Sequence, residues 1–328
     1  MRICLLVFLG LSCVLNLQGQ IIKGVVLDEQ SGDSIDFASV FFSGTFVGTI
    51  TDPEGRFELD ISKYRNRPLT ISAMGYYTYT IAELNPAEFL QVSLKPRIFE
   101  IEEVSVSTKS LVRQRKACLR RFRREFIGSS SNAQRCYILN EEDITFNYGS
   151  DRDTLKAYAS KPLHLMNFSL GYEITYHLYR FEYQRKTQTT LYTGDIVFKR
   201  EMAGNEKEVA KFKRRRAYTY TGSCSHFFRS LWADELDESG FYIRQAKNGE
   251  YLGYADLVLE TLQGKKYLVS FEDLHIDYFE HTSHASFIKN RVFFEADGYY
   301  DPIAVIWSGT LAKQRVADFL PYEYQPGE

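Results

Sequence analysis

The stretch from Gly44 to Phe57 constrains the fold more than any other part of the sequence. It reads Gly-Thr-Phe-Val-Gly-Thr-Ile-Thr-Asp-Pro-Glu-Gly-Arg-Phe, in which Thr, Val and Ile favour extended backbone. The segment Asp52-Pro53-Glu54-Gly55 supplies an Asp that can cap a turn, a Pro that fixes φ and a Gly that tolerates positive φ. The stretch holds no nucleophile or metal-ligand set. It therefore predicts a hairpin that belongs to a scaffold and not to a catalytic centre.

Short strand-like segments flank this hairpin, each bounded by turn residues. They are residues 24–28 and 37–42 before it, and residues 57–61, 69–71 and 92–94 after it. Their lengths and spacing predict a small β-sandwich.

A set of residues in this region matches the pattern of a known domain. The set is Gly24, Val26, Asp28, Gly32, Ala38, Val40, Gly44-Thr45, Gly48-Thr49, Thr51-Asp52, Gly55, Phe57, Gly75-Tyr76 and Glu103-Val104. In these positions the chain resembles the carboxypeptidase-like regulatory domain, a transthyretin-like Greek-key β-sandwich that also precedes the plug of many TonB-dependent outer-membrane receptors. It departs at Asp33-Ser34-Ile35, where the family usually has a proline. The resemblance implies a non-catalytic domain and a cell-envelope setting for residues 20–107.

Length and composition fit a folded, β-rich protein. The chain has 328 residues, of which 44% are hydrophobic and 25% charged, enough for two domains. Its 23 Tyr and 24 Phe against 2 Trp are typical of sheets covered on one face by large rings. The formal net charge of -2 gives no general attraction to nucleic acid or to anionic membranes.

The first residues are typical of a secretory signal peptide. Met1-Arg2 precedes an apolar run from Ile3 to Leu17 that is too short to span a bilayer. We therefore expect a signal over residues 1–19, a mature chain from about Gln20, and export to the periplasm, the outer-membrane surface or the medium. Lipidation at Cys13 is the alternative, although Gly10 stands where lipoprotein signals usually have a large aliphatic residue. No later apolar stretch is long enough to form a transmembrane helix.

Three cysteines follow the predicted signal: Cys118, Cys136 and Cys224. This odd number cannot pair completely. A bridge between Cys118 and Cys136 and a role as buried, small apolar residues both stay open.

Residues 108–130 are expected to form a basic helical linker, because Leu111 to Phe126 is Arg-rich with apolar residues on one helical face. Residues 131–328 predict a β-rich α+β domain. Expected strands are residues 136–139, 174–178, 191–198, 251–260 and 267–279, with hairpin turns at Asn248-Gly249 and Asp297-Gly298. Two helices are expected, one capped by Ser225 and ending at Gly240, the other from Thr310 to Phe319.

A zinc carboxypeptidase needs a His and a Glu three residues apart and a distant second His. No histidine of this chain is followed by Glu at that spacing. The best remaining candidates for a metal site are His275, Asp277, His281 and His284. Alternation along residues 274–278 places the polar side chains outward instead. We therefore predict no metal or other cofactor, and keep a metal-dependent hydrolase as an alternative.

Two groups of residues are candidates for ligand binding. The basic run 211–216, including Arg214, Arg215 and Arg216, could contact an anionic glycolipid or polysaccharide, since export argues against nucleic acid. The rings of Tyr172, Tyr176, Tyr179, Tyr183 and Tyr192 could stack on sugars if an open sheet exposes them.

The sequence thus predicts a mainly β protein with an N-terminal sandwich, a connecting basic helix and a β-rich α+β C-terminal domain. We expect a non-catalytic exported cell-envelope protein that acts as a binding or structural module. Envelope proteins or glycans are the expected partners, and a glycan-binding surface module is the second alternative.

Overall fold

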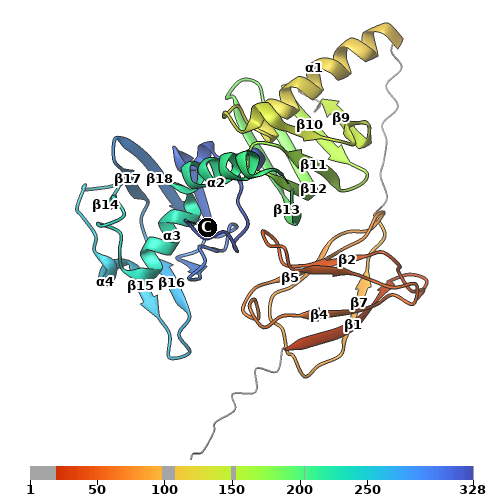
Figure 1. Cartoon of the computed structure of the whole chain (residues 1–328), viewed down its shortest axis with the longest axis horizontal. Coiled ribbons are helices and arrows are strands. Elements are labelled where there is room, and N and C mark those ends of the chain that lie inside the picture. The colour runs from red at the N-terminus through yellow and green to blue at the C-terminus, as the bar shows by residue number, and fades with distance from the viewer. Residues whose placement is uncertain (1–19, 98–107, 149–152, 203, 328) are drawn as a thin grey trace, which may run out of the picture.

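The computed structural model describes residues 20–97, 108–148, 153–202 and 204–327. The predicted signal peptide, Glu103-Val104 of the domain pattern and residues 98–107 lie outside these ranges. Figure 1 shows three bodies: a sandwich (residues 20–97), a middle domain (108–202) and a C-terminal domain (224–309), followed by a tail (310–327) that returns to the other two.

The sandwich consists of two antiparallel-rich sheets packed face to face, which confirms the predicted β-sandwich. One sheet has the order β4-β1-β7 and the other β3-β2-β5-β6. The strands are β1 (Ile21–Asp28), β2 (Ser39–Phe41), β3 (Gly48–Ile50), β4 (Arg56–Asp60), β5 (Leu69–Ser72), β6 (Tyr79–Ile81) and β7 (Leu90–Leu94). Alternation along β1 buries Ile22 and Val26 against Val40 and Ile71 of the facing sheet.

The turn at Asp52 to Gly55 forms as predicted, but the strands on either side do not pair. Gly55 has φ +72 and donates its N–H to the Asp52 carbonyl at 2.9 Å. However, β3 belongs to one sheet and β4 to the other, so the predicted hairpin is wrong. The turn therefore connects the two sheets of the sandwich. This connection places Phe57 of β4 in the core that both sheets share.

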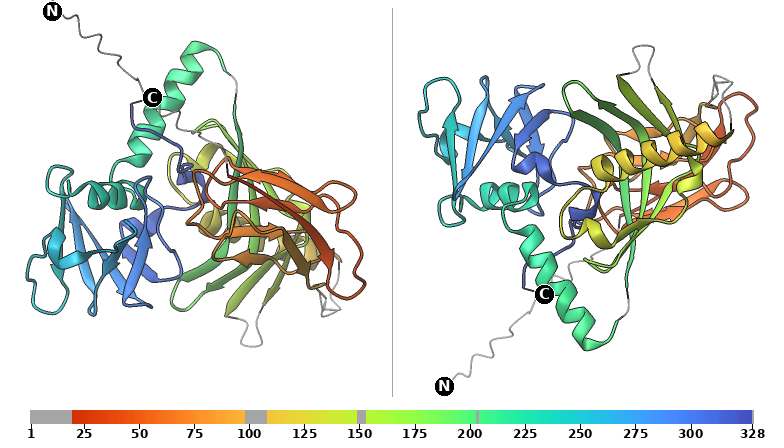
Figure 2. Two further views of the ribbon diagram at one scale, coloured as in Figure 1. Left: turned by 90° about the horizontal axis from the view of Figure 1, so that it is seen from below. Right: turned by 90° about the horizontal axis from the view of Figure 1, so that it is seen from above.

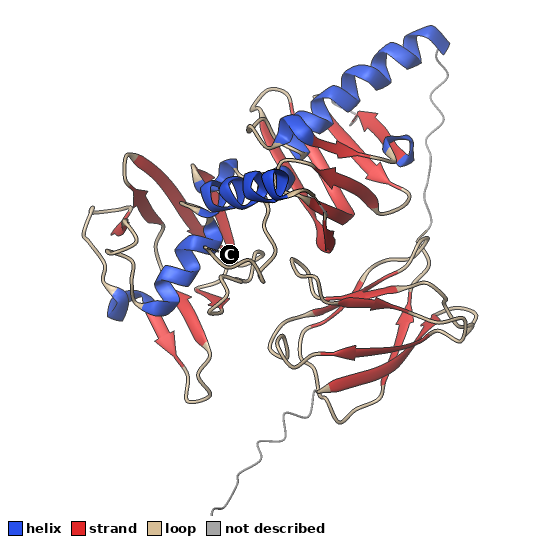
Figure 3. Cartoon of the chain, in the orientation of Figure 1, coloured by secondary structure: helices blue, strands red, loops and turns tan. Residues whose placement is uncertain are grey.

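The middle domain is a six-stranded sheet with one long helix across it (Figures 1 and 3). Its strands are β8 (Cys136–Ile138), β9 (Ile144–Tyr148), β10 (Thr154–Ala159), β11 (Leu163–Asn167), β12 (Tyr172–Gln184) and β13 (Thr189–Glu201). Helix α1 (Thr108–Phe126) is where the basic linker was expected. It packs Phe122 and Phe126, both 0% exposed, onto the sheet. The helix is therefore part of this domain and not a free connection.

Helix α2 (Glu206–Tyr220) connects the middle domain to the C-terminal domain and was not predicted as a helix. It begins with a capping box: Asn205 Oδ1 accepts the Glu208 N–H, and the Glu208 carboxylate accepts the Asn205 N–H. Helix α3 (Cys224–Ala233) follows, and its cap is Ser223 where Ser225 was expected.

The C-terminal domain consists of two small sheets and short helices around one core. The sheet orders are β14-β17-β18-β20 and β15-β16-β19. The elements are β14 (Phe241–Gln245), α4 (Tyr254–Leu257), β15 (Val258–Glu260), β16 (Lys266–Val269), β17 (Leu274–Tyr278), β18 (His281–Phe287), β19 (Arg291–Phe294) and β20 (Val305–Gly309). The predicted strand 251–260 thus contains a helical turn, and the predicted strand 267–279 is two strands. Both predicted hairpin turns form, with φ of +74 at Gly249 and +86 at Gly298.

The tail contains two 3-10 turns, Leu311–Lys313 and Val316–Asp318, where an α-helix was predicted. Val316 and Ala317 enter the core of the middle domain. There the Asn167 amide donates to the Ala317 carbonyl at 2.9 Å. Residues 131–328 therefore contain two cores that are joined by this returning segment (Figure 2). None of the helices in the described ranges combines the length and apolar character needed to cross a membrane.

Candidate functional site: the junction of the sandwich with the rest of the chain

A site of ion pairs and aromatic rings surrounds Arg67, which lies in the sandwich between β4 and β5. A turn positions it, since its N–H donates to the Tyr64 carbonyl at 3.0 Å. Its guanidinium is 2% exposed and forms ion pairs with Glu295, at 2.5 Å from Nε, and with Asp297, both in the C-terminal domain. Burial alone would lower the pKa of Arg67, but the two carboxylates outweigh it and hold the pKa above its ordinary value.

Three tyrosine rings enclose the same guanidinium. Its Cζ atom lies 4.6 Å from the ring centroid of Tyr64, 4.4 Å from that of Tyr299 and 4.8 Å from that of Tyr322. Cation–π contacts of a desolvated guanidinium contribute about 2 kcal/mol in favourable cases. Burial raises the pKa of all three phenols, so they stay neutral. The cage therefore fixes one cation of the sandwich among groups from the C-terminal domain and the tail.

The loop that carries the Gly44-Thr45 signature forms a second contact. It pairs in parallel with β13, where the Gly44 N–H donates to the Ile196 carbonyl at 2.7 Å and the Phe198 N–H to the Thr45 carbonyl at 3.0 Å. From the other side, the Tyr322 N–H donates to the Gly44 carbonyl at 2.9 Å. The loop thus covers part of an edge strand whose backbone groups would otherwise be open to another chain.

The outer face of sheet β3-β2-β5-β6 forms the third contact. Leu69 and Ile71 of β5 point into the sandwich core, whereas Thr70 and Ser72 point outward and are nevertheless buried. Phe41 also faces outward and stacks on the ring of His177 with a centroid separation of 4.8 Å. The middle domain covers these side chains.

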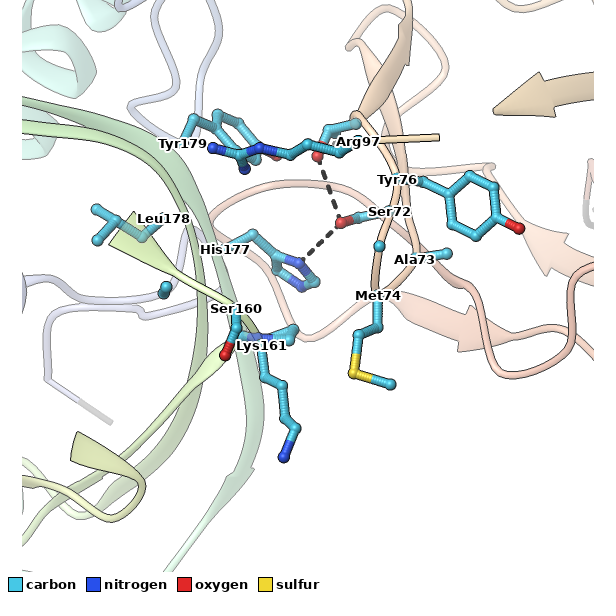
Figure 4. A pocket seen from close by; sticks show the side chains of 14 residues that line it. Ser72, Ala73, Met74, Tyr76, Arg97, Ser160, Lys161, His177, Leu178 and Tyr179 are labelled. Carbon is cyan, nitrogen blue, oxygen red and sulfur yellow. Dashed lines mark hydrogen bonds between the residues drawn. The ribbon is translucent and has the colours of Figure 1, made fainter. Parts of the chain in front are cut away.

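Figure 4 shows the polar part of this face, where His177 Nδ1 lies 3.1 Å from the Ser72 hydroxyl. Burial lowers the pKa of His177 to about 4, so the imidazole is neutral at pH 7. Nearby, the Tyr179 hydroxyl donates to the Asp195 carboxylate, which also lies 3.5 Å from the Thr70 hydroxyl. The cavity between the two domains is about 40 Å³, room for a few waters but not for an organic ligand.

The structure places four of the five candidate tyrosines in the core of the middle domain, with Tyr172, Tyr176 and Tyr183 buried and Tyr192 partly buried against them. Tyr172 is 1% exposed and Tyr176 3% exposed, and the Tyr176 ring meets Phe126 of α1 edge to face. Tyr179 is engaged by Asp195 at the junction. The prediction of a sugar-stacking surface is therefore corrected for Tyr172 and Tyr176, because their rings have no free faces.

The arginines of the basic run lie on α2 and differ in how far they are exposed. Arg216 is 7% exposed, donates from Nε to the Leu170 carbonyl at 2.7 Å, pairs with Glu201 at 2.9 Å and stacks over Tyr172. It is a structural residue and not a free ligand contact. Arg214 is exposed and Arg215 is half-buried.

The four candidate metal ligands lie on β17 and β18 but do not converge. His275 and His284 are directly opposite, with ring centroids 4.5 Å apart. Asp277 is engaged by Arg244, at 2.8 Å from Nε, and by the Thr282 hydroxyl. His281 opposes Tyr278 and, by the period of two, lies on the other face of the sheet. Among the residues described, no three His, Cys, Asp or Glu side chains are placed to hold a metal ion.

Cys118, Cys136 and Cys224 are not joined in disulfides, so the Cys118–Cys136 bridge is not present. Burial raises the pKa of Cys136 and of Cys224 to about 12. Both thiols are therefore protonated at neutral pH, and a protonated thiol is a poor nucleophile.

Residues 22–106 match the family model of the CarboxypepD_reg-like domain. The sandwich is a CarboxypepD_reg-like domain. The predicted resemblance is thereby confirmed, and the domain family is non-catalytic. No curated protein matches the chain.

The junction uses residues that the sequence analysis did not select, above all Arg67, His177 and Asp195. One signal was present in the sequence: the Gly44-Thr45 signature marks a loop with a fixed conformation, and this loop pairs with β13. Arg67 offered no comparable signal, because a single arginine in a turn usually has a solvated side chain.

Proposed function

We propose that this chain is a non-catalytic exported protein of the cell envelope, in which the CarboxypepD_reg-like domain is a fixed structural platform for the two domains that follow. The observation that carries the proposal is the burial of Arg67 among carboxylates and rings of the C-terminal domain and tail. A domain that acts as a mobile appendage would keep its interdomain contacts small and exchangeable. The platform presents the middle and C-terminal domains to a binding partner.

The polar groups of the junction support a structural role. Arg67, Asp195 and His177 each bond to a side chain of the facing domain. The cavity that His177 lines between the sandwich and the middle domain is too small for a substrate. Export is supported by the leader-like sequence of residues 1–19 and by the envelope setting that the domain resemblance implies.

A cleavage experiment tests the platform. A protease recognition sequence inserted within residues 98–107 allows the sandwich to be cut from the purified full chain. We expect the two fragments to stay together in size-exclusion chromatography at neutral pH, and to separate when Arg67→Met is also present. Lys23→Met is the control, since Lys23 pairs with Glu58 on the exposed surface of the sandwich. Immediate separation of the cut wild-type fragments would refute a fixed platform.

Export has its own test. Cell fractionation followed by mass spectrometry of the intact protein is expected to find a chain that begins near Gln20 outside the cytoplasm. A full-length chain beginning at Met1 in the cytoplasm would contradict the proposal.

A further inference from the structure

A second cavity lies away from the junction, between α2 and the middle domain, and has a volume of about 220 Å³. One face of α2 forms its wall, because Glu208, Lys211, Phe212 and Arg215 follow the spacing of a single helical stripe. Arg135, Phe168 and Met202 of the middle domain line the opposite side. The helix is held over this cavity by Phe212, whose ring occupies the space beside Gly171 that a Cβ would fill.

The charges around this cavity are unbalanced. Arg135, Lys211 and Arg215 all line it, and within the described ranges none of the three lies within ion-pair distance of a carboxylate. The single acidic side chain, Glu208, is turned to the start of α2, where its carboxylate accepts the Asn205 N–H at 3.1 Å. The neighbouring Arg216 shows the contrast, since Glu201 and two carbonyl groups satisfy it.

The apolar part of the lining makes this more than a solvated basic surface. Phe168, Met202 and Phe212 provide ring and thioether surface next to the unpaired cations. Arg135 and Lys211 are exposed, whereas the half-buried Arg215 is partly shielded from water. An anion that reaches its guanidinium forms charge-assisted hydrogen bonds, about twice as strong as neutral ones. Inorganic anions would satisfy the charges but leave the apolar wall in contact with water.

We propose that this cavity binds a small organic anion, a carboxylate or phosphate monoester whose attached aromatic or short alkyl group packs on Phe168, Met202 and Phe212. The volume is below the ~300–1,000 Å³ of sites for drug-sized ligands, so the ligand is small or only its anionic end enters. The inference does not depend on the junction, and its test leaves the junction unchanged.

Isothermal titration calorimetry on the full-length mature protein tests the proposal with phenyl phosphate as the probe. Phenyl phosphate is expected to bind at least tenfold more tightly than inorganic phosphate, and neutral benzyl alcohol is expected not to bind. Equal affinity for phenyl phosphate and inorganic phosphate, or no binding of either, would overturn the proposal.

Variants of α2 locate the site. Arg215→Gln and Lys211→Gln each remove one lining charge, and we expect each to weaken phenyl phosphate binding at least tenfold. Arg214→Gln is the matched control, because it removes one exposed positive charge from the same helix without touching the cavity. A loss of affinity in Arg214→Gln equal to that in Arg215→Gln would show general surface attraction and defeat the assignment.

A third variant tests the apolar wall. Phe168 is 38% exposed, so Phe168→Ala is not expected to disturb the fold, which circular dichroism verifies. The variant should lose the preference for phenyl phosphate over inorganic phosphate while keeping its affinity for inorganic phosphate. An unchanged preference would count against packing on this ring.

Co-sedimentation with vesicles distinguishes the source of the anion. Binding to phosphatidylglycerol vesicles that Arg215→Gln abolishes and Arg214→Gln preserves would identify a lipid phosphate as the ligand's anionic end. If phenyl phosphate binds in solution and the vesicles do not, the ligand is a free organic anion, and the cavity assignment stands in both cases. Vesicle binding that Arg214→Gln and Arg215→Gln reduce equally would argue against the cavity.

Discussion

Arg67 Nε and Glu295 Oε2 lie 2.5 Å apart although 228 residues separate them in the chain. The guanidinium comes from a turn of the sandwich, and the carboxylate follows β19 of the C-terminal domain. The arginine is 2% exposed and the glutamate side chain 18% exposed, so the pair is largely removed from water. This contact joins the first and the last of the three bodies directly.

Replacing Arg67 tests how much the junction contributes to stability. Arg67→Met removes the cation and leaves the half-buried carboxylates of Glu295 and Asp297 close together without a counter-charge. Breaking a buried pair in this way costs about 3–5 kcal/mol. We expect a loss of that size in the free energy of unfolding, measured by urea denaturation. Lys23→Met, which breaks a pair with both side chains more than half exposed, should cost under ~1 kcal/mol. Similar losses in the two variants would contradict the assigned role of Arg67.

Alanine substitutions at Gly44 and Gly32 test whether the Gly44-Thr45 loop needs its close contact with the tail. Their φ angles are +78 and +76, so alanine meets the same backbone strain at both positions. An added Cβ at Gly44 would overlap the ring of Tyr322, whereas nothing lies within 4 Å of one at Gly32. Gly44→Ala is therefore expected to cost about 2 kcal/mol more than Gly32→Ala in thermal or urea unfolding. Equal costs would show that the loop does not need its close contact with the tail.

The sandwich could be predicted from sequence because its signals are local. The turn at Asp52 to Gly55 carries its own turn residues, and alternation along each strand marks the buried face. The pairing of β3 and β4 was wrong because turn chemistry does not say which sheet the next strand joins. Helix α2 was missed although Asn205 and Glu208 form a capping box, a signal that the density of basic residues after it obscured.

The junction could not be predicted in the same way. Thr70 and Ser72 alternate with Leu69 and Ile71 as on a strand with one solvated face, so nothing in this pattern indicates that a second domain covers them. Tyr172 and Tyr176 show the opposite case, since both were candidates for an exposed sheet face and both are buried. The Tyr176 ring meets Phe126 of α1, and the Tyr172 ring meets Phe198 of β13. Contacts between bodies depend on pairs of distant residues, and one sequence does not show which distant residues meet.

Phe122 tests whether α1 belongs to the middle domain. Its ring is 0% exposed and lies 4.7 Å from that of Phe181 on β12, measured between centroids. Phe122→Ala removes a core ring and should cost about 3–5 kcal/mol in urea unfolding. Val112 on the same helix is 64% exposed, so Val112→Ala should change stability by less than ~0.5 kcal/mol. A small effect at Phe122 would mean that α1 acts as a loosely attached linker after all.

The lowered pKa of His177 predicts how the stability of the protein depends on pH. Burial lowers the pKa of His177 to about 4, and the charges of Lys199 and His164 act in the same direction. In the unfolded chain the pKa is about 6.5, so between these two values the unfolded state binds more protons and stability falls as pH falls. From pH 7 to pH 4.5 the protonation of this group alone should lower the free energy of unfolding by about 2 kcal/mol.

His177→Gln cannot take up this proton, so its free energy of unfolding should fall by about 2 kcal/mol less than that of the wild type over the same range. His281→Gln, at an exposed histidine of β18, is the control and should follow the wild type. Urea titrations at the two pH values measure the difference, and parallel losses in wild type and His177→Gln would show that His177 does not lie neutral between the sandwich and the middle domain.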